Sequence, residues 1–539
     1  MKKFSFLMLL ISGLGFSMPP HPSIITNSIF LSQVKGYAAK KLTTLGITKR
    51  EYSPQKTTKT SGNIKFPVLL IQFTDLSNES VSTTTFFSNL LNGTNENQLS
   101  LKKYYYDMSG GKLNLTLIVY GIYTSKSNYQ YYGKNDYNGD DLHAGELVGE
   151  AIDMAISNGV DFSQFDNDSD GRVDGVIVIH AGMGEEVAST NADYIWSHRW
   201  SLSEAKDWGD GSGPRTNNGK VIDDYTIQPE YIENPGDSAI GVFAHELGHI
   251  FGLPDLYDTS YLTHGVGDWS LMSYGAWLGP KKLGEQPAPL LSWEKARLGW
   301  ITVEEPLLIA GLKDSFSYIA ILISIITYII FEKFKKEKLK ALKRLFIMFS
   351  LFSLFNLSCF LFPDNKKTDS DKEIFEFPID FPHMFTIIEL TNIEESKKAI
   401  KVTLPDPSGR QYLLIENKVK IPGTWTEYLP GEGLLILRIN ENFTTDYYMS
   451  NNIVNAGLYR IHGVEVVEAD GTNGFDLRKR VDYGSSNDTF YYGNNDRLTP
   501  DSNPPMIYFT STTYSSSNKA YIYIENITSK SNIMSFTLR

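Results

Sequence analysis

The sequence predicts an α/β domain followed by a β-rich region, and three observations support this organisation. Between residues 66 and 250, apolar runs of strand length alternate with helical patterns, which is typical of α/β packing. Beyond residue 385, short alternating segments rich in Tyr, Thr, Ser and Asn predict an all-β, sandwich-like region. Between the two parts, residues 307–384 carry two long apolar runs, which predict an inserted hydrophobic helical hairpin.

Composition limits the class of protein. A chain of 539 residues that is 41% hydrophobic can bury a large core, so we expect two or more domains. The net charge of -12 makes nucleic acid an unexpected partner. Cys359 is the only cysteine, so the fold has no intrachain disulfide and we expect bound calcium to contribute the stabilisation instead.

The N-terminus has the pattern of a secretory leader. Lys2 and Lys3 precede an apolar run from Phe4 to Phe16, which predicts a signal peptide over residues 1–17. Residues 18–61 are polar and rich in lysine, and we interpret them as a pro-segment or N-terminal arm. The α/β domain is then expected over 62–306 and the β-rich region over 385–539.

The individual elements follow from local periodicity. In the first domain we expect strands at 66–73, 113–120 and 176–180, and helices at 83–92, 99–108 and 141–158. In the β-rich region we expect strands at 386–390, 411–416 and 433–439. A further helix is expected to begin after Asp237 or Ser238, either of which has a side chain able to cap its N-terminus.

This last helix carries the motif with the clearest chemistry. His245 and His249 are one turn apart, so both imidazoles lie on one face and reach a single Zn²⁺. Glu246 lies between them and is placed to act as a general base on a metal-bound water. Gly252 and Pro254 end the helix, so the chain turns back and presents Asp255 as a third zinc ligand. Asp258 is the alternative third ligand.

A methionine-containing turn follows the helix. In residues 269–275, Met272 is expected to place an apolar thioether below the metal site. With this turn, the chain resembles the metzincin-type secreted proteases of the immune inhibitor A family, whose pattern is H-E-x-x-H-x-x-G-x-x-D. The resemblance also rests on the segments 18–22, 195–199, 225–231, 265–270, 287–289, 296–300 and 429–433.

This resemblance implies a metzincin-like zincin fold, a histidine, histidine and aspartate ligand set, bound calcium and a downstream β-rich region. It also carries over to Tyr274, which follows Met272 by two residues where some metzincins place a tyrosine that binds the metal or the transition state. The alternative for Tyr274 is an aromatic side chain packed in the turn. The family usually passes from Trp300 into strands with a short connection, so residues 307–384 depart from its pattern.

A second metal site is predicted from an acidic loop. Asp166, Asp168, Asp170 and Asp174 alternate around Gly171 with the spacing of a calcium-binding loop. The twelfth position is Ile177, not glutamate, so the loop is expected to lead into a strand. A solvated acidic turn is the alternative. Residues 468–471 and 487–488 have a similar composition, and there we favour solvated turns over calcium.

The insertion contains two predicted membrane helices. Residues 316–331 and 345–362 are almost wholly apolar, and the basic segment 332–344 lies between them. The positive-inside rule places this basic loop in the cytoplasm and both flanking domains outside, so 316–362 is interpreted as a membrane tether. Two alternatives stay open: a second leader with lipidation at Cys359, and a disrupted or fused reading frame.

Together these patterns predict a secreted zinc-dependent endopeptidase, synthesised as a zymogen and acting on extracellular protein or peptide substrates. The protein is expected outside the cell, free or anchored to the cytoplasmic membrane with its catalytic domain outside. The competing hypothesis is a catalytically impaired surface adhesion or binding protein on a protease scaffold.

Overall fold

A computed structural model describes residues 16–21, 58–306 and 385–539, apart from short gaps at 96–97, 137–138, 189–192, 262, 458–460, 473–482 and 512–515. Residues 1–15 of the predicted leader (1–17), most of the N-terminal arm and the predicted helices at 316–331 and 345–362 lie outside the described residues. Among the residues that are described, no helix is long and apolar enough to cross a membrane.

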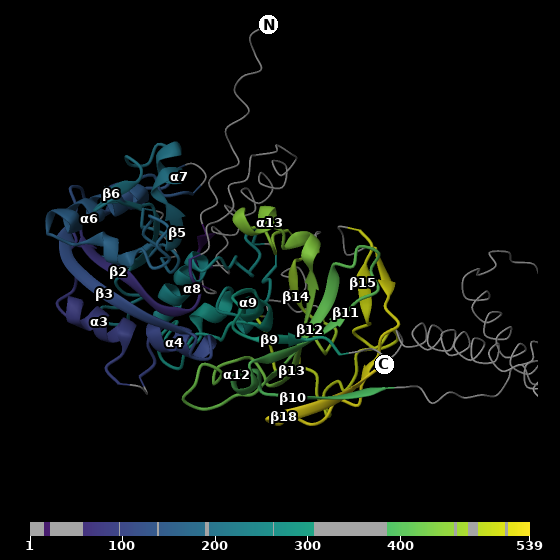
Figure 1. The fold of residues 1–539 in the computed structure, drawn as a ribbon. Helices are drawn as coiled ribbons and strands as arrows, with labels where there is room; N and C mark the ends of the chain where they lie inside the picture. The colour runs from purple at the N-terminus through teal and green to yellow at the C-terminus, as the bar shows by residue number, and fades with distance from the viewer. Residues whose placement is uncertain are drawn as a thin grey trace, which may run out of the picture.

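A six-stranded mixed sheet forms the centre of the first domain (Figure 1). In spatial order its strands are β1 (Phe16–Ser17), β5 (His198–Ser201), β8 (Asp224–Pro229), β4 (Val176–His180), β2 (Gly62–Gln72) and β3 (Leu113–Thr124). The last four strands are parallel, whereas β5 runs antiparallel to β8, and β1 runs antiparallel to β5. The sheet therefore ends on one side in an antiparallel edge.

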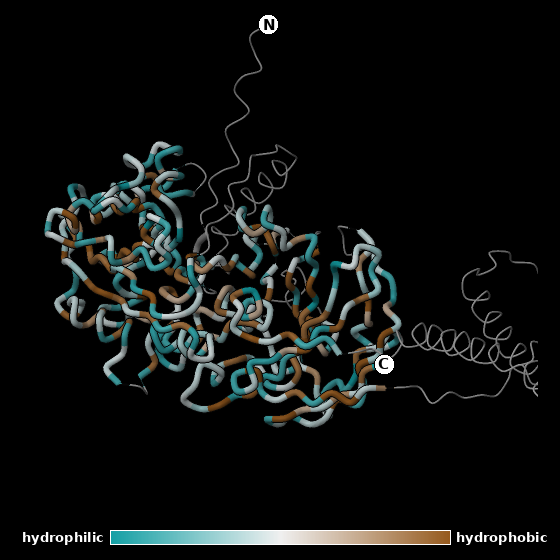
Figure 2. The backbone as a smooth tube through the Cα atoms, viewed as in Figure 1, coloured by the Kyte–Doolittle hydropathy of each residue, from teal (hydrophilic) through white to brown (hydrophobic). Residues whose placement is uncertain are grey.

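The sheet separates two apolar cores. Alternate residues of β2 point to opposite faces, so Phe66 and Val68 join one core while Leu69 and Ile71 join the other. The first core is covered by α3 (Thr84–Asn92), α4 (Leu101–Met108) and α8 (Ile240–Ile250), and the second by α6 (Ala144–Ser157). Figure 2 shows the apolar segments running through the interior of both parts of the molecule.

Shorter elements complete this domain. They are α5 (Tyr129–Gly133), η1 (Phe162–Phe165), α7 (Leu202–Asp207), β6 (Arg215–Asn217), β7 (Lys220–Ile222), η2 (Gly267–Trp269), η3 (Tyr274–Trp277), α9 (Ser292–Arg297) and β9 (Thr302–Glu304). Among the predicted elements, the strand at 176–180 is found with the expected bounds, and the other predicted strands and helices of this domain shift by a few residues at their ends.

The expected capping of α8 is wrong. Its N-cap is Ala239, which makes no side-chain capping hydrogen bond. The carboxylate of Asp237 is used by the preceding loop instead, where it accepts the backbone N–H groups of Ile232, Glu233 and Asn234. Ser238 donates to the carbonyl of Glu230. Tertiary packing of the apolar helix therefore substitutes for the missing cap.

The C-terminal part is rich in β-structure, as predicted. Its strands are β10 (Thr386–Thr391), β11 (Lys398–Thr403), β12 (Gln411–Lys418), β13 (Gly433–Asn440), β14 (Val464–Val466), β15 (Ile507–Phe509), β16 (Ser517–Lys519), β17 (Ile524–Glu525) and β18 (Ile533–Leu538). A five-stranded sheet has the order β14-β13-β12-β11-β9, and a three-stranded sheet has the order β10-β18-β17. Side chains of both sheets share one core. The short helices are α12 (Ile393–Ser396), η6 (Glu441–Phe443) and α13 (Asp446–Ser450).

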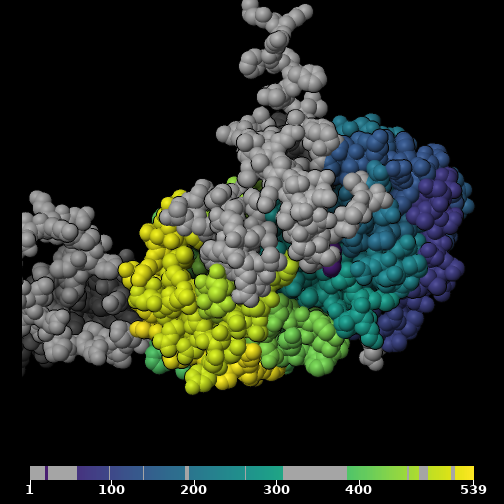
Figure 3. All heavy atoms as spheres, turned by 180° about the vertical axis from the view of Figure 1, so that it is seen from behind, coloured from purple at the N-terminus to yellow at the C-terminus, as the bar shows by residue number. Residues whose placement is uncertain are grey.

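The two parts of the chain pack directly against each other. β9 belongs to the first part by sequence, yet it pairs in parallel with β11 of the second. Leu414, Leu435 and Leu437 from the C-terminal sheet lie in the same core as α8. Figure 3 shows both parts in contact on the face opposite to that of Figure 1. The C-terminal part is therefore placed to contribute side chains to the first domain.

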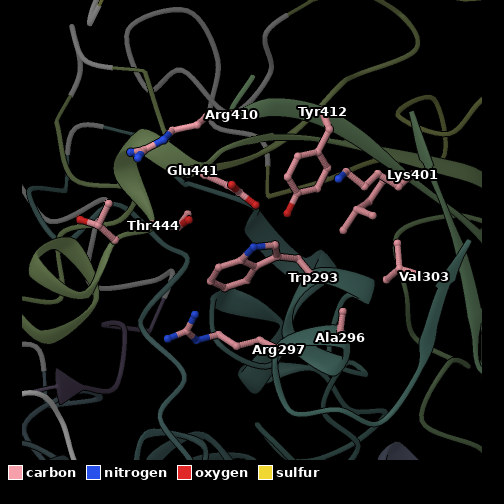
Figure 4. A pocket seen from close by; sticks show the side chains of 11 residues that line it. Trp293, Ala296, Arg297, Val303, Lys401, Arg410, Tyr412, Glu441 and Thr444 are labelled. Atoms are coloured by element: carbon pink, nitrogen blue, oxygen red, sulfur yellow. The ribbon is translucent and has the colours of Figure 1, made fainter. Parts of the chain in front are cut away.

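A pocket of about 550 Å³ lies on this boundary. Trp293 and Arg297 of α9 form one side, and Lys401 and Tyr412 of the C-terminal sheet form the other (Figure 4). Its lining contains none of the predicted zinc ligands. The predicted metal chemistry therefore lies elsewhere, on α8.

Candidate active site

Helix α8 presents His245 and His249 to one buried point. Both side chains are fully buried, and each ring is oriented by a backbone carbonyl. Nδ1 of His245 donates to the carbonyl of Leu271 at 2.9 Å, and Nδ1 of His249 donates to that of Leu253 at 2.8 Å. Because a carbonyl only accepts, the proton of each neutral ring is on Nδ1, and each Nε2 keeps its lone pair.

Asp255 completes a set of three ligand atoms. Its Oδ1 lies 3.0 Å from Nε2 of His245 and 3.4 Å from Nε2 of His249, and the two Nε2 atoms are 3.2 Å apart. Ligands about 2.0 to 2.1 Å from a tetrahedral zinc would lie about 3.3 Å from one another. Three ligand atoms thus converge in a buried space, where a cation would relieve the mutual repulsion of their lone pairs. The residues fit zinc.

Glu246 adjoins this cluster from the same helix and is fully buried. Burial raises the pKa of its carboxyl well above the usual range, and the nearby carboxylates of Asp255 and Glu186 raise it further, against a smaller lowering by the Met18 backbone. A carboxyl group that binds protons readily next to a metal site is suited to proton transfer.

The methionine turn lies beneath the helix as predicted. Sδ of Met272 packs so closely on Gly248 that a Cβ atom there would meet it at 2.6 Å, so a larger residue between the two histidines would displace the Met272 side chain. The turn is fixed by Ser270, whose Oγ accepts the N–H of Met272 and donates to both oxygens of Glu294 at 2.8 Å. Glu294 therefore supports the turn that orients His245.

Asp258 lies apart from the three ligands. Its Oδ1 accepts from the backbone of Ser260 and of Gly457, and its Oδ2 accepts from Thr263. These donors organise the loop after Asp255. Among the described residues, the cluster able to hold a metal at α8 contains Asp255 and not Asp258.

Tyr274 lies in an aromatic cluster. Its ring packs edge-on against His264 at 5.4 Å and Tyr483 at 4.8 Å, with Tyr257 at 6.0 Å. Burial raises the pKa of Tyr274 well above its usual range, and its acidic and phenolic neighbours, Tyr483 first, add to the effect. These contacts account for a packed turn aromatic, and a catalytic role of Tyr274 stays a prediction.

His180 and His198 are buried and do not belong to the ligand cluster. Nδ1 of His180 bonds to the carbonyl of Ala181, and Nδ1 of His198 to that of Trp196. Burial lowers the pKa of both imidazoles to about 4, so both rings are neutral at physiological pH. Structural roles account for both.

The acidic loop brings together three of its four predicted calcium ligands. Carboxylate oxygens of Asp166, Asp168 and Asp170 lie within 4.8 Å of one another. Asp174 is outside this group, and its Oδ2 accepts two hydrogen bonds from Asn167. Nζ of Lys220 lies 2.6 Å from Oδ2 of Asp166 and neutralises part of the charge. Calcium at this loop, with or without Asp174, stays a prediction.

A third acidic group lies in the C-terminal part, where oxygens of Glu468, Asp470 and Asp488 come within 4.8 Å of one another. Asp488 accepts from Nε1 of Trp269 at 3.0 Å and from the backbone N–H of Ser485 at 2.9 Å. The Trp269 contact joins this group to the methionine turn. Glu468 and Asp488 are buried, which does not fit the solvated turns expected there.

Residues 16–21 lie along the open edge of the sheet next to the site. β1 pairs with β5 through Phe16 and Ser17, and the N–H of His21 donates to the carbonyl of Glu186 at 2.9 Å. Indole N–H groups of Trp196 and Trp277 donate to the carbonyls of Met18 and Pro19. The segment thus adds an extended strand at the edge beside Glu246.

Three residues near the site escape sequence reasoning: Glu186, Glu294 and Asn452. Glu186 is bonded by Ser197 at the start of β5, and Asn452 contacts Asp255. None of them belongs to a local motif, and Asn452 is 197 positions from Asp255 along the chain. Glu294 follows Ser292 and Trp293 in the short helix α9, a setting that gives no signal of its own.

Sequence comparisons agree with this geometry. Residues 71–301 match the immune inhibitor A peptidase M6 catalytic domain. The chain is 37% identical over 222 residues to the pre-pro-metalloprotease PrtV of Vibrio cholerae, a match that covers 37% of this chain and 23% of that protein. It is 36% identical over 204 residues to immune inhibitor A of Bacillus thuringiensis subsp. alesti, covering 33% of this chain and 29% of that protein.

The chain thus spans less than a third of the length of these curated relatives. The matched region contains β3, β4, β5 and β8 of the sheet, the helix α8, the methionine turn and all three converging ligands. Residues 71–301 therefore resemble the catalytic domain of the immune inhibitor A peptidases, and the chain is similar to a metalloprotease and to an immune inhibitor A.

Proposed function

We propose that this protein is a zinc-dependent endopeptidase that hydrolyses extracellular proteins or peptides. The observation that carries the proposal is the convergence of His245, His249 and Asp255 beside Glu246 in a fully buried cluster. When bound there, zinc would polarise the scissile carbonyl and lower the pKa of a water molecule towards about 7. Glu246 accepts the proton of that water and passes it to the leaving amine.

Substrate is proposed to bind as an extended strand along β5. The edge of β5 accepts an antiparallel partner, because β1 pairs with it in this way. Residues 16–21 occupy that edge in the structure, and 18–21 would stay there after cleavage of the leader, which supports a latent form in which the N-terminal arm must leave before a substrate strand enters. We expect removal of this arm to raise the rate of casein hydrolysis. N-terminal sequencing of the active species shows whether the arm has been removed.

Three further assignments belong to this proposal: a leader over residues 1–17 that directs secretion, a structural Ca²⁺ at Asp166, Asp168, Asp170 and Asp174, and a membrane tether within 316–362. The intact ligand set and base favour an active enzyme over an adhesion protein on a protease scaffold, since loss of function removes the constraint on such residues.

The test is Glu246→Gln in the full chain. This variant keeps the size of the side chain and the three zinc ligands, so zinc content should equal that of the parent while casein cleavage falls by orders of magnitude. Glu204→Gln, on the exposed helix α7, is a matched control that should cleave casein like the parent. Equal cleavage by the parent and Glu246→Gln would contradict the role of Glu246.

A further inference from the structure

Asp255 is held by a side chain from the C-terminal part of the chain. The backbone N–H of Asp255 donates to Oδ1 of Asn452 at 2.8 Å, and Nδ2 of Asn452 donates in return to Oδ2 of Asp255. The other carboxylate oxygen, Oδ1, faces the imidazoles of His245 and His249. The carboxamide thus takes one oxygen of Asp255 and leaves the second directed at the metal position.

The carboxamide has a single orientation. A backbone N–H only donates and an ionised carboxylate only accepts, so the two contacts fix which end of the Asn452 amide is oxygen and which is nitrogen. Asn452 is 2% exposed, and its carbonyl accepts a hydrogen bond from Oγ1 of Thr259 at 3.1 Å. Its φ of 51° is left-handed, a conformation that asparagine tolerates better than most residues.

Residues that follow Asn452 in the chain contact the loop that begins at Asp255. Nδ2 of Asn455 donates to the carbonyl of Leu256 at 2.8 Å, and the N–H of Gly457 donates to Asp258 at 2.9 Å. Residues 452–457, which we call the support segment, therefore contact the loop that starts at Asp255 at several successive positions. Only Asn452 touches the side chain of Asp255 among these contacts.

We propose that Asn452 is a positioning residue of the metal centre, so that the C-terminal part completes the catalytic unit. The inference rests on the zinc assignment made above. Without the amide donor, Oδ2 of Asp255 is a buried charged oxygen lacking its hydrogen bond, and the carboxylate is free to rotate away from the metal position. Changes at such outer contacts typically weaken metal binding about 10- to 100-fold.

The variant Asn452→Gly tests this in the full chain. Glycine accepts the left-handed backbone without strain, so the change removes the carboxamide alone. Asn526→Gly is the matched control, because Asn526 has a φ of 55° and an exposed side chain in the same part of the molecule. Thr259→Val is a second control: it loosens the main chain of Asn452 and leaves the carboxamide in place.

Zinc affinity is measured by competition with a chromophoric chelator, and ligand geometry by the visible absorption of the Co²⁺-substituted protein. We expect Asn452→Gly to bind zinc about 10- to 100-fold more weakly and to alter the cobalt spectrum. Both controls should match the parent. Zinc affinity and a cobalt spectrum equal to those of the parent in Asn452→Gly would overturn the proposal, even if its apo form melts at a lower temperature.

A measurement on the unmodified protein covers the case in which Asn452→Gly does not fold. Zinc should slow hydrogen exchange in the support segment as well as around Asp255, because the two are bonded to each other. Protection around Asp255 alone would overturn the proposal. Since neither readout needs turnover, a parent protein that binds zinc but cleaves no casein would contradict the proposed function and leave this inference standing.

Discussion

The metal centre on α8 and the acidic loop 166–174 differ in how their ligand atoms are satisfied. At α8, the atoms of His245, His249 and Asp255 that face away from the cluster are bonded to carbonyls or to Asn452, and the remaining lone pairs converge in a buried space. In the loop, carboxylates accept from backbone N–H groups of the loop itself and from Lys220.

This difference indicates which of the two sites needs its ion for stability. The ligand atoms of the α8 cluster face one another in a buried space, where a bound cation would offset the repulsion between their lone pairs. The acidic loop has partners of its own and two exposed carboxylates, Asp168 and Asp170. We therefore expect the stability of the folded protein to depend strongly on zinc at α8 and less on calcium at the loop.

The largest expected effect is at the first site. His249→Ala removes one of three ligands, so the protein should lose bound zinc on dialysis and casein cleavage should fall by more than about 100-fold. Zinc content is measured by elemental analysis beside the initial rate. Asp168→Ala is the control and should keep its zinc. If His249→Ala retained one zinc ion per chain, His249 would not be a required ligand and the expected difference between the two sites would be contradicted.

The second effect concerns the buried support of the methionine turn. Burial raises the pKa of Glu294 from 4.5 to about 7. Between these values the folded protein keeps a proton that the unfolded chain has lost, so stability falls as pH rises through this window, by up to about 3 kcal/mol. Glu294→Gln carries no charge and should lose this part of the pH dependence.

Urea unfolding of the parent and of Glu294→Gln at pH 5 and pH 8 provides the measurement. Glu395→Gln, an acidic residue of α12 on the boundary between the two parts, serves as the control. Parallel pH dependence of the parent and Glu294→Gln would show that Glu294 titrates like an exposed carboxyl.

The third effect tests the loop. Calcium at about 100 times its dissociation constant adds about 2.7 kcal/mol to the folded state, which raises the melting temperature by about 5 °C or more. Asp168→Ala should lose this rise and keep its zinc. Asp501→Ala, which removes an exposed carboxylate paired with Lys519, should retain it. A full calcium effect in Asp168→Ala would exclude the loop as the calcium site.

The smallest expected effect is a change in calcium affinity when Lys220 is replaced. Its ammonium lies 2.6 Å from Oδ2 of Asp166 and would compete with a calcium ion for the same oxygen. Lys220→Met should therefore bind calcium more tightly by about 1 kcal/mol, roughly fivefold. Calorimetric titration of the zinc-loaded protein measures this, and unchanged or weaker binding would mean that calcium does not displace the lysine.

A strand of this fold can be predicted from the sequence where its buried residues are apolar. β4 is apolar at four of five positions and buried throughout, so its bounds are readable from the sequence. β5 and β8 were not predicted, because His198 and Arg199 in one strand and Thr226 and Gln228 in the other are polar yet buried. Their place in the sheet is decided by neighbouring strands and not by local pattern.

The site shows the same division. His245, Glu246, His249 and Asp255 lie within eleven residues, so their helix and turn can be inferred from spacing. The outer contacts cannot, because Glu294 and Asn452 reach the site through tertiary packing. Asp174 illustrates the limit within a motif: the spacing suggests a ligand, but Asn167 engages its carboxylate.

Asp255 and Asn452 are separated by 197 positions, so they become available at different times during synthesis of the chain. A chain is synthesised from its N-terminus, so the histidines and Asp255 leave the ribosome well before residue 452. Under the proposal made for Asn452, the metal centre would receive its last support only when most of the polypeptide is available. Assembly of the centre would thereby be coupled to completion of the chain.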